Sequence, residues 1–137
     1  MIVLSGTGKE EALGRIRDHI TVNGRKLWTM FDSGARNTYV VADVATDMLT
    51  WKISPPEPAV LGGKTHKITR ECMLIGTIQG LRVRTHARVI QELGKDENER
   101  PIDVLFGALA MQEWGIRLVP EEERLDLTHY PKEFVEY

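Results

Sequence analysis

Short runs of alternating apolar and polar residues, broken by glycine, asparagine and proline, recur along most of this chain. The first run covers residues 15–31 and is divided at 23–24 by Asn-Gly, the pair that favours a type I′ turn. A second run covers residues 68–91 and is divided by Gln-Gly at 79–80. Because successive side chains of a strand point to opposite faces, each run predicts a β-hairpin.

The segments between these hairpins carry different signals. Residues 40–49 space apolar side chains as in a short helix, and the proline cluster at 55–58 predicts a stiff surface loop without regular structure. Residues 59–65 predict two extended arms joined at Gly62-Gly63. A glycine tip is mobile and lets another backbone approach closely. This stretch alone does not distinguish such a tip from an ordinary surface hairpin.

The last third of the chain mixes short strands with one helix. A charged loop is expected at 94–101, an apolar strand ending in glycine at 103–107, and a helix at 108–114. Two further strands are expected at 116–119 and 124–127, separated by an acidic turn. Many short strands and one late helix predict a mostly β fold, a closed barrel or a sandwich.

Composition narrows the class of protein. The 137 residues suit one domain, and 42% hydrophobic with 28% charged residues is ordinary for a soluble protein. A net charge of -2 gives no reason to expect nucleic acid or a membrane as partner. The arginines at 82–88 have no aromatic residues between them, so we expect a solvated strand face rather than an RNA surface. With no apolar run as long as a membrane span, a cytoplasmic protein is expected.

Other reactive side chains offer weaker candidate sites. Residues 5–9 superficially resemble a phosphate-binding loop but lack its earlier glycine and its final Ser or Thr. The single cysteine, Cys72, lies in an apolar run with no assignable histidine, so we expect a structural thiol. No metal or cofactor is expected, because metal-ligand spacing is lacking among the four histidines, His19, His66, His86 and His129.

One acidic residue is distinctive because an apolar run, residues 27–31, leads directly into it. It opens the turn Asp32-Ser33-Gly34, and an aliphatic run at 39–41 follows. Asp-Ser-Gly can be a plain turn, since Asp and Ser side chains bond local backbone and Gly accepts positive φ. Its meaning therefore depends on the rest of the chain.

Three elements in order resemble the retropepsin-like aspartic proteases: the apolar strand into Asp-Ser-Gly-Ala (27–35), a glycine-bearing hairpin placed like the family's flap (61–63), and the apolar segment with glycine that opens the late helix (102–109). The segment at 114–120 is similar to the strand that follows this helix in microbial single-domain members. The expected organisation is an N-terminal arm, a protease domain and a C-terminal tail, at residues 1–14, 15–128 and 129–137 respectively.

The resemblance implies a closed acid-protease barrel of retropepsin type with a flap hairpin and one short C-terminal helix. It further implies an aspartic endopeptidase in which two aspartates share a proton and activate a water. This chain has a single Asp-Ser-Gly in that context, so the second aspartate is expected from an identical chain in a C2 homodimer. The expected substrate is a peptide or unfolded protein.

The same resemblance assigns the site residues. The catalytic group is Asp32, Ser33 and Gly34. Ser33 is expected to bond across the dimer interface, and Gly34 to let the loop backbone bond the carboxylate. The substrate-binding set comprises the residues after this group and the flap tip, namely Ala35, Arg36, Asn37, Leu61, Gly62 and Gly63.

Two positions depart from the retroviral pattern. Retroviral members commonly carry Asp and Arg, which pair near the interface, where this chain has Arg36 and Ala108. Both partners are absent together, so no buried charge is left unpaired, but retroviral interface detail does not transfer. Two alternatives stay open: a non-catalytic dimeric peptide-binding or scaffold module of the same fold, and a generic β-barrel with an incidental Asp-Ser-Gly turn.

Overall fold

The structure is a computed structural model that describes residues 14–132. The expected arm, apart from its last residue, and the end of the expected tail lie outside these residues. In this part the elements follow in the order β1 (Arg15–Val22), β2 (Arg25–Asp32), β3 (Tyr39–Val41), α2 (Ala42–Ala45), β4 (Thr50–Leu61), β5 (Lys64–Ile78), β6 (Leu81–Ile90), β7 (Val104–Phe106), α3 (Ala108–Glu113), β8 (Arg117–Val119), the 3₁₀ turn η1 (Pro120–Glu122) and β9 (Arg124–Asp126).

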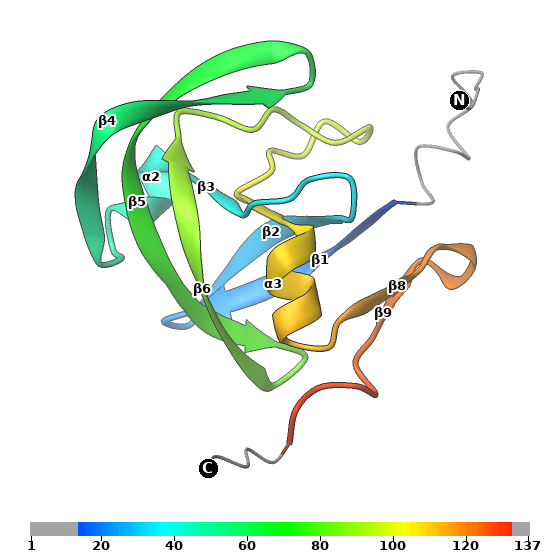
Figure 1. Ribbon diagram of the computed structural model, residues 1–137. Coiled ribbons are helices and arrows are strands. Elements are labelled where there is room, and N and C mark those ends of the chain that lie inside the picture. The colour runs from blue at the N-terminus through cyan, green and yellow to red at the C-terminus, as the bar shows by residue number, and fades with distance from the viewer. Residues whose placement is uncertain (1–13, 133–137) are drawn as a thin grey trace.

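Seven of the strands form one curved sheet in the order β1-β2-β7-β3-β6-β5-β4 (Figure 1). An extra pairing of Thr21 with Thr77 joins β1 to β5, which connects the ends of six strands into a ring. The strands β8 and β9 form a separate hairpin, and α3 lies across the barrel. The expected mostly β fold with one short late helix is confirmed. No helix among the described residues is long and apolar enough to cross a membrane.

The tight turns match the expected chemistry. Asn23 and Gly24 have φ of 51° and 78°, and Gln79 and Gly80 have φ of 49° and 83°. Positive φ at both central residues is the mark of a type I′ turn, whose twist suits the flanking strands. The hairpins predicted at 15–31 and 68–91 are therefore confirmed.

Two aromatic rings lie at the centre of the core. Phe31 of β2 and Phe106 of β7 are fully buried, and their ring centroids are 5.2 Å apart. A smaller cluster under the β4–β5 hairpin consists of Tyr39, Ala59, Ile68 and Ile90. Along β1 and β2 most of the buried residues lie on one face, as in a half-buried sheet.

The expectation for the proline cluster is wrong. Residues 55–58 lie inside β4, and the pairing of β4 with β5 shifts register between Lys52 and Glu57. Proline lacks the N–H that a ladder needs, but β4 is at the edge of the sheet, where an irregularity is tolerated. The helix expected at 40–49 is also too long, since it is confined to Ala42–Ala45. The preceding valines pair instead in β3.

Candidate active site

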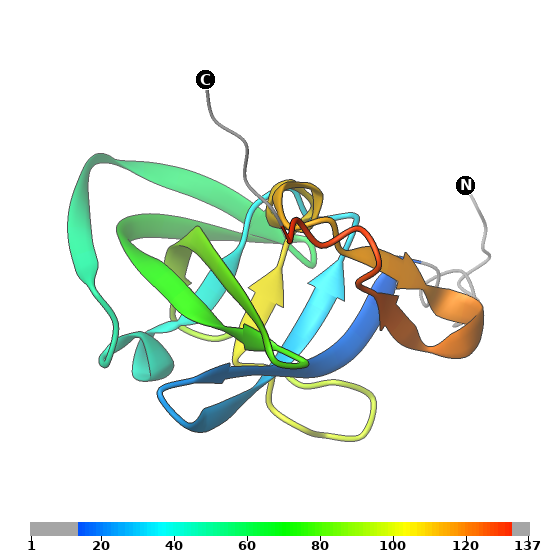
Figure 2. The same ribbon diagram turned by 90° about the horizontal axis from the view of Figure 1, so that it is seen from below.

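The Asp32 side chain lies where three strands meet. Asp32 ends β2, which pairs antiparallel with β1 and parallel with β7, and Figure 2 shows these strands side by side. Only 9% of the residue is exposed. Oδ1 accepts a hydrogen bond from the Gly34 N–H at 2.8 Å, and Oδ2 lies 3.4 Å from Nε of Arg15 on β1. The loop backbone and a cation on β1 thus each contact one oxygen of the carboxylate.

The loop after Asp32 is stabilised within its own chain. The Ser33 N–H donates to the Gly14 carbonyl at 2.8 Å, and the Ser33 hydroxyl is 3.4 Å from the same oxygen. The Ala35 N–H donates to the Asp32 carbonyl at 3.2 Å, which closes the turn. The bond of Ser33 across a dimer interface stays a prediction.

The junction between β7 and α3 supports this loop from behind. The Gly107 N–H donates to Oγ1 of buried Thr38 at 3.0 Å. The Ala108 N–H donates to the Ala35 carbonyl at 2.7 Å. A Cβ at position 107 would lie 2.2 Å from the Asn37 carbonyl oxygen, so only glycine allows this approach. The late glycine is therefore required by packing against the Asp32 loop.

A cavity of about 710 Å³ connects the Asp32 loop with the β4–β5 hairpin. Its lining includes Asp32, most of the loop that follows it, and part of the hairpin tip. The cavity therefore brings together most of the predicted site residues, namely Asp32, Gly34, Ala35, Arg36, Asn37, Leu61 and Gly62. Ser33 and Gly63 are not among the residues that line it. The tip glycines have φ of 57° and 77° and open space around them.

Sequence reasoning missed several residues of this cavity. Met30 lies two residues before Asp32, on the same face of β2, and is paired with Leu105 of β7. Together with Ile102 and Val60 these side chains give the cavity an apolar wall. The period of two along β2 was a usable signal for Met30. No local pattern indicated the others.

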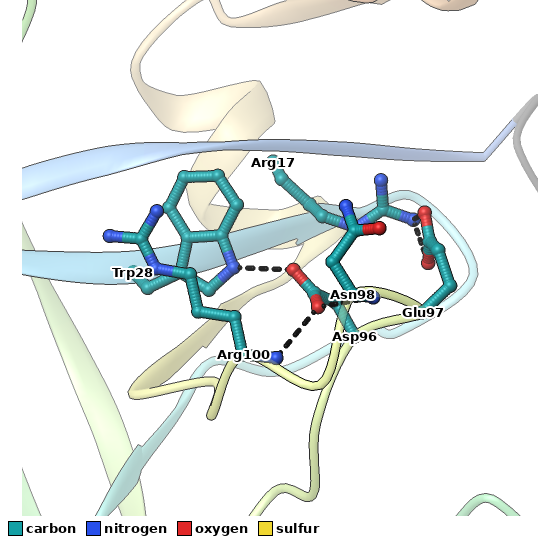
Figure 3. Close-up of polar contacts among 6 residues, drawn as sticks. All are labelled: Arg17, Trp28, Asp96, Glu97, Asn98 and Arg100. Atoms are coloured by element: carbon teal, nitrogen blue, oxygen red, sulfur yellow. Dashed lines mark hydrogen bonds and ion pairs between the residues drawn. The ribbon is translucent and has the colours of Figure 1, made fainter.

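A polar network holds the loop between β6 and β7 beside the cavity (Figure 3). Oδ1 of Asp96 accepts the N–H groups of Asn98 and Arg100 at 2.9 and 3.0 Å, and Oδ2 accepts Nε1–H of Trp28 at 2.9 Å. The Arg100 guanidinium stacks 3.9 Å from the centre of the Trp28 ring. These contacts, led by the Arg100 N–H, hold the pKa of Asp96 below its usual value. They also position Lys95 at the rim of the cavity.

Of the other candidate residues, His66 lines the cavity, whereas Cys72, His19 and His86 do not. Cys72 is buried in β5, and burial, with a smaller effect of the neighbouring Glu71, raises the pKa of its thiol to about 11. His19 packs against Trp28, and His86 against Trp51. Across residues 14–132, no group of three or more His, Cys, Asp or Glu side chains is arranged to hold a metal ion.

No protein-family model and no curated protein matched the sequence. Among solved structures, the retroviral protease-like domain of Ddi1 from Leishmania major is similar over 85% of this chain and 88% of its own, with a TM-score of 0.58 and 14% identity. The EIAV protease, solved with the inhibitor HBY-793, is similar over 77% and 92%, with a TM-score of 0.54 and 14% identity. A foamy viral protease-reverse transcriptase bound to an RNA/DNA hybrid is similar over 73% of this chain but only 12% of its own, with a TM-score of 0.52 and 11% identity. Identities this low bear on the fold alone, and on that evidence the chain has a retropepsin-like fold.

Proposed function

We propose that the protein is an aspartic endopeptidase, a microbial single-domain protease of retropepsin type that acts as a homodimer. The observation that carries the proposal is the setting of Asp32. Asp32 is the last residue of β2, and its carboxylate accepts a hydrogen bond from the Gly34 N–H. The residue lines a cavity that the hairpin tip also lines. The proposed protease domain is residues 15–128.

The chemistry needs a second carboxylate, and one chain supplies only Asp32 in this setting. A two-fold axis beside Asp32 would bring the same residue of a partner opposite it. Two close carboxylates share one proton, so one accepts a proton from water while the other donates to the peptide carbonyl. No metal or cofactor takes part in this scheme.

The Arg15–Asp32 contact does not oppose such pairing. The Arg15 side chain is 46% exposed and the Asp32 side chain 13%, and a pair that is open to water on one side and 3.4 Å apart contributes only about 1 kcal/mol. Repositioning Arg15 as a partner approaches is therefore inexpensive. Ser33, at the outer side of the loop, would then exchange its long contact with Gly14 for one to the partner.

The cavity suits an extended peptide. Substrate would bind as an added strand between the Asp32 loop and the β4–β5 hairpin, with its side chains in alternate pockets. Gly62 and Gly63 at the tip would let the hairpin close over the peptide and exclude water. Ala35, Arg36, Asn37 and Leu61 would contact the substrate.

The test is hydrolysis of unfolded casein and of a peptide library between pH 4 and 7, with the mass of the protein measured by sedimentation. Asp32→Asn should abolish cleavage, and Asp47→Asn, which changes an exposed aspartate outside the cavity, should not. In an equal mixture of wild type and Asp32→Asn that has exchanged subunits, activity should fall to about one quarter, because only wild-type pairs hold two carboxylates.

Each alternative gives a different result. A wild-type dimer that cleaves nothing would refute the protease and favour a peptide-binding module of the same fold. A chain that stays monomeric at high concentration would refute both dimeric functions. Activity that falls only to one half in the mixing experiment would show that each chain works alone.

A further inference from the structure

The cavity beside Asp32 is surrounded by basic side chains. Arg36, Lys64 and Lys95 line it, and all three residues are exposed. Within the described part of the chain, none of these cations makes an ion pair. Apart from Asp32, which already has Arg15 beside it, the only acidic lining residue is Glu92. This excess of positive charge occurs in a chain whose net charge is -2.

The three cations come from three different segments. Arg36 belongs to the loop after Asp32, Lys64 begins β5 and pairs with Leu61 in the hairpin, and Lys95 is in the loop between β6 and β7. The last loop is held by the Asp96 network and by a bridge between Lys95 and Pro101. Positive charge therefore reaches the cavity from the Asp32 loop, from the β4–β5 hairpin and from the loop between β6 and β7.

The apolar wall of the cavity lies between these cations. Met30 and Leu105 lie paired beside Asp32, and Ile102 adds to the same wall. An apolar side chain of a bound peptide would pack here. Carboxylates a few residues before or after it would reach the surrounding cations, because side chains of an extended segment are spaced about 3.3 Å apart.

We propose that the protease cleaves acidic peptide segments, in which an apolar residue at the scissile bond is flanked by Asp or Glu. The inference rests on the proposed protease function and specifies its substrate class. Exposed pairs are individually weak, so each flanking carboxylate should raise kcat/KM by about two- to fivefold at low salt. Two or three together should give about tenfold, and screening should shrink this preference in 0.5 M NaCl.

The experiment compares three peptides with one apolar core, flanked by Glu, Gln or Lys. The wild-type protein should cleave the Glu peptide fastest and the Lys peptide slowest. The double variant Lys64→Glu, Lys95→Glu should reverse this order. Lys26→Glu is the matched control, because it changes the charge of an exposed lysine at the far end of β2 and should keep the wild-type order. Equal kcat/KM for the three peptides, or an unchanged order in the double variant, would overturn the inference while leaving the protease intact.

Binding separates the inference from the function on which it rests. Calorimetric titration of Asp32→Asn with the same peptides reads the selectivity of the cavity without cleavage. A preference for the Glu peptide, with no cleavage of any peptide or of casein by wild type, would support acidic selectivity and refute the protease. No cleavage together with equal binding of the three peptides would overturn both.

Discussion

Gly107→Ala should break the contact between the β7–α3 junction and the loop that follows Asp32. The added Cβ would lie 2.2 Å from the Asn37 carbonyl oxygen and 2.8 Å from that of Arg36, whereas ordinary contact begins near 3.4 Å. All of these atoms belong to backbone, so no side chain can rotate away. At φ −92° and ψ 177° the backbone itself accepts alanine, and the whole cost is therefore steric.

The magnitude follows from the contacts at risk. Overpacking a well-packed site costs about 1–3 kcal/mol. Separating the two segments also weakens the hydrogen bonds from Gly107 to Thr38 and from Ala108 to Ala35, each contributing about 1 kcal/mol. If the two segments move apart, the steric cost falls but the hydrogen bonds weaken. We therefore expect a total loss of about 2–5 kcal/mol in the free energy of unfolding.

The assay is urea denaturation followed by Trp fluorescence, with cleavage of casein measured on the same samples under conditions where both variants are folded. Gly80→Ala is the control: its φ of 83° makes alanine costly by about 1–2 kcal/mol, but no atom lies near the added Cβ and the turn is remote from Asp32. Gly107→Ala should lose cleavage, whereas folded Gly80→Ala should retain it. A Gly107→Ala protein within about 0.5 kcal/mol of wild type would refute the close approach.

Thr38→Val keeps the shape of a buried side chain but removes the acceptor of the Gly107 N–H, so the free energy of unfolding should fall by about 1–3 kcal/mol. Thr38→Ser keeps the hydroxyl and should retain most of the wild-type stability. Asp96→Asn should be less stable at pH 7, as its amide cannot satisfy all three donors. Because the pKa of Asp96 is lowered on folding, the stability that its carboxylate provides is present above about pH 4 and declines as the pH falls further. Urea titrations should therefore show a smaller difference in unfolding free energy between variant and wild type below about pH 4 than at pH 7. Cys72, whose pKa is about 11, should resist iodoacetamide at pH 8 until the protein unfolds. Its contribution to the free energy of unfolding should decline as pH rises from 9 toward 11, and the Cys72→Ala variant should lack this decline.

The part of the site formed by β1 and β2 could be predicted from turn chemistry. The Asn-Gly turn at 23–24 sets the register of β1 and β2, and the same register pairs Arg15 with Asp32. The ion pair at the carboxylate was therefore implied by the sequence once the turn was recognised. The position of Asp32 at a strand end was predicted for the same reason.

The contacts between segments distant in the sequence could not be predicted. The parallel pairing of β2 with β7 joins residue 29 to residue 104, and no nearby pattern encodes it. The proline cluster was misassigned because proline excludes individual ladder bonds but not an edge strand with a register shift. The helix expected at 40–49 was overextended because its apolar spacing also suits the valines of β3.

The basic surround of the cavity also bears on assembly. Two unit negative charges 4 Å apart repel by about 4 kcal/mol at an effective dielectric constant of 20, so a close pair of Asp32 carboxylates needs a shared proton or nearby cations. Arg36, Lys64 and Lys95 line the cavity beside Asp32 in each chain. Cations that favour acidic peptides would therefore also stabilise the proposed dimer. Charge reversal at the rim can then lower activity through dissociation alone. The order of preference among peptides is free of that effect, because dissociation lowers cleavage of all three equally.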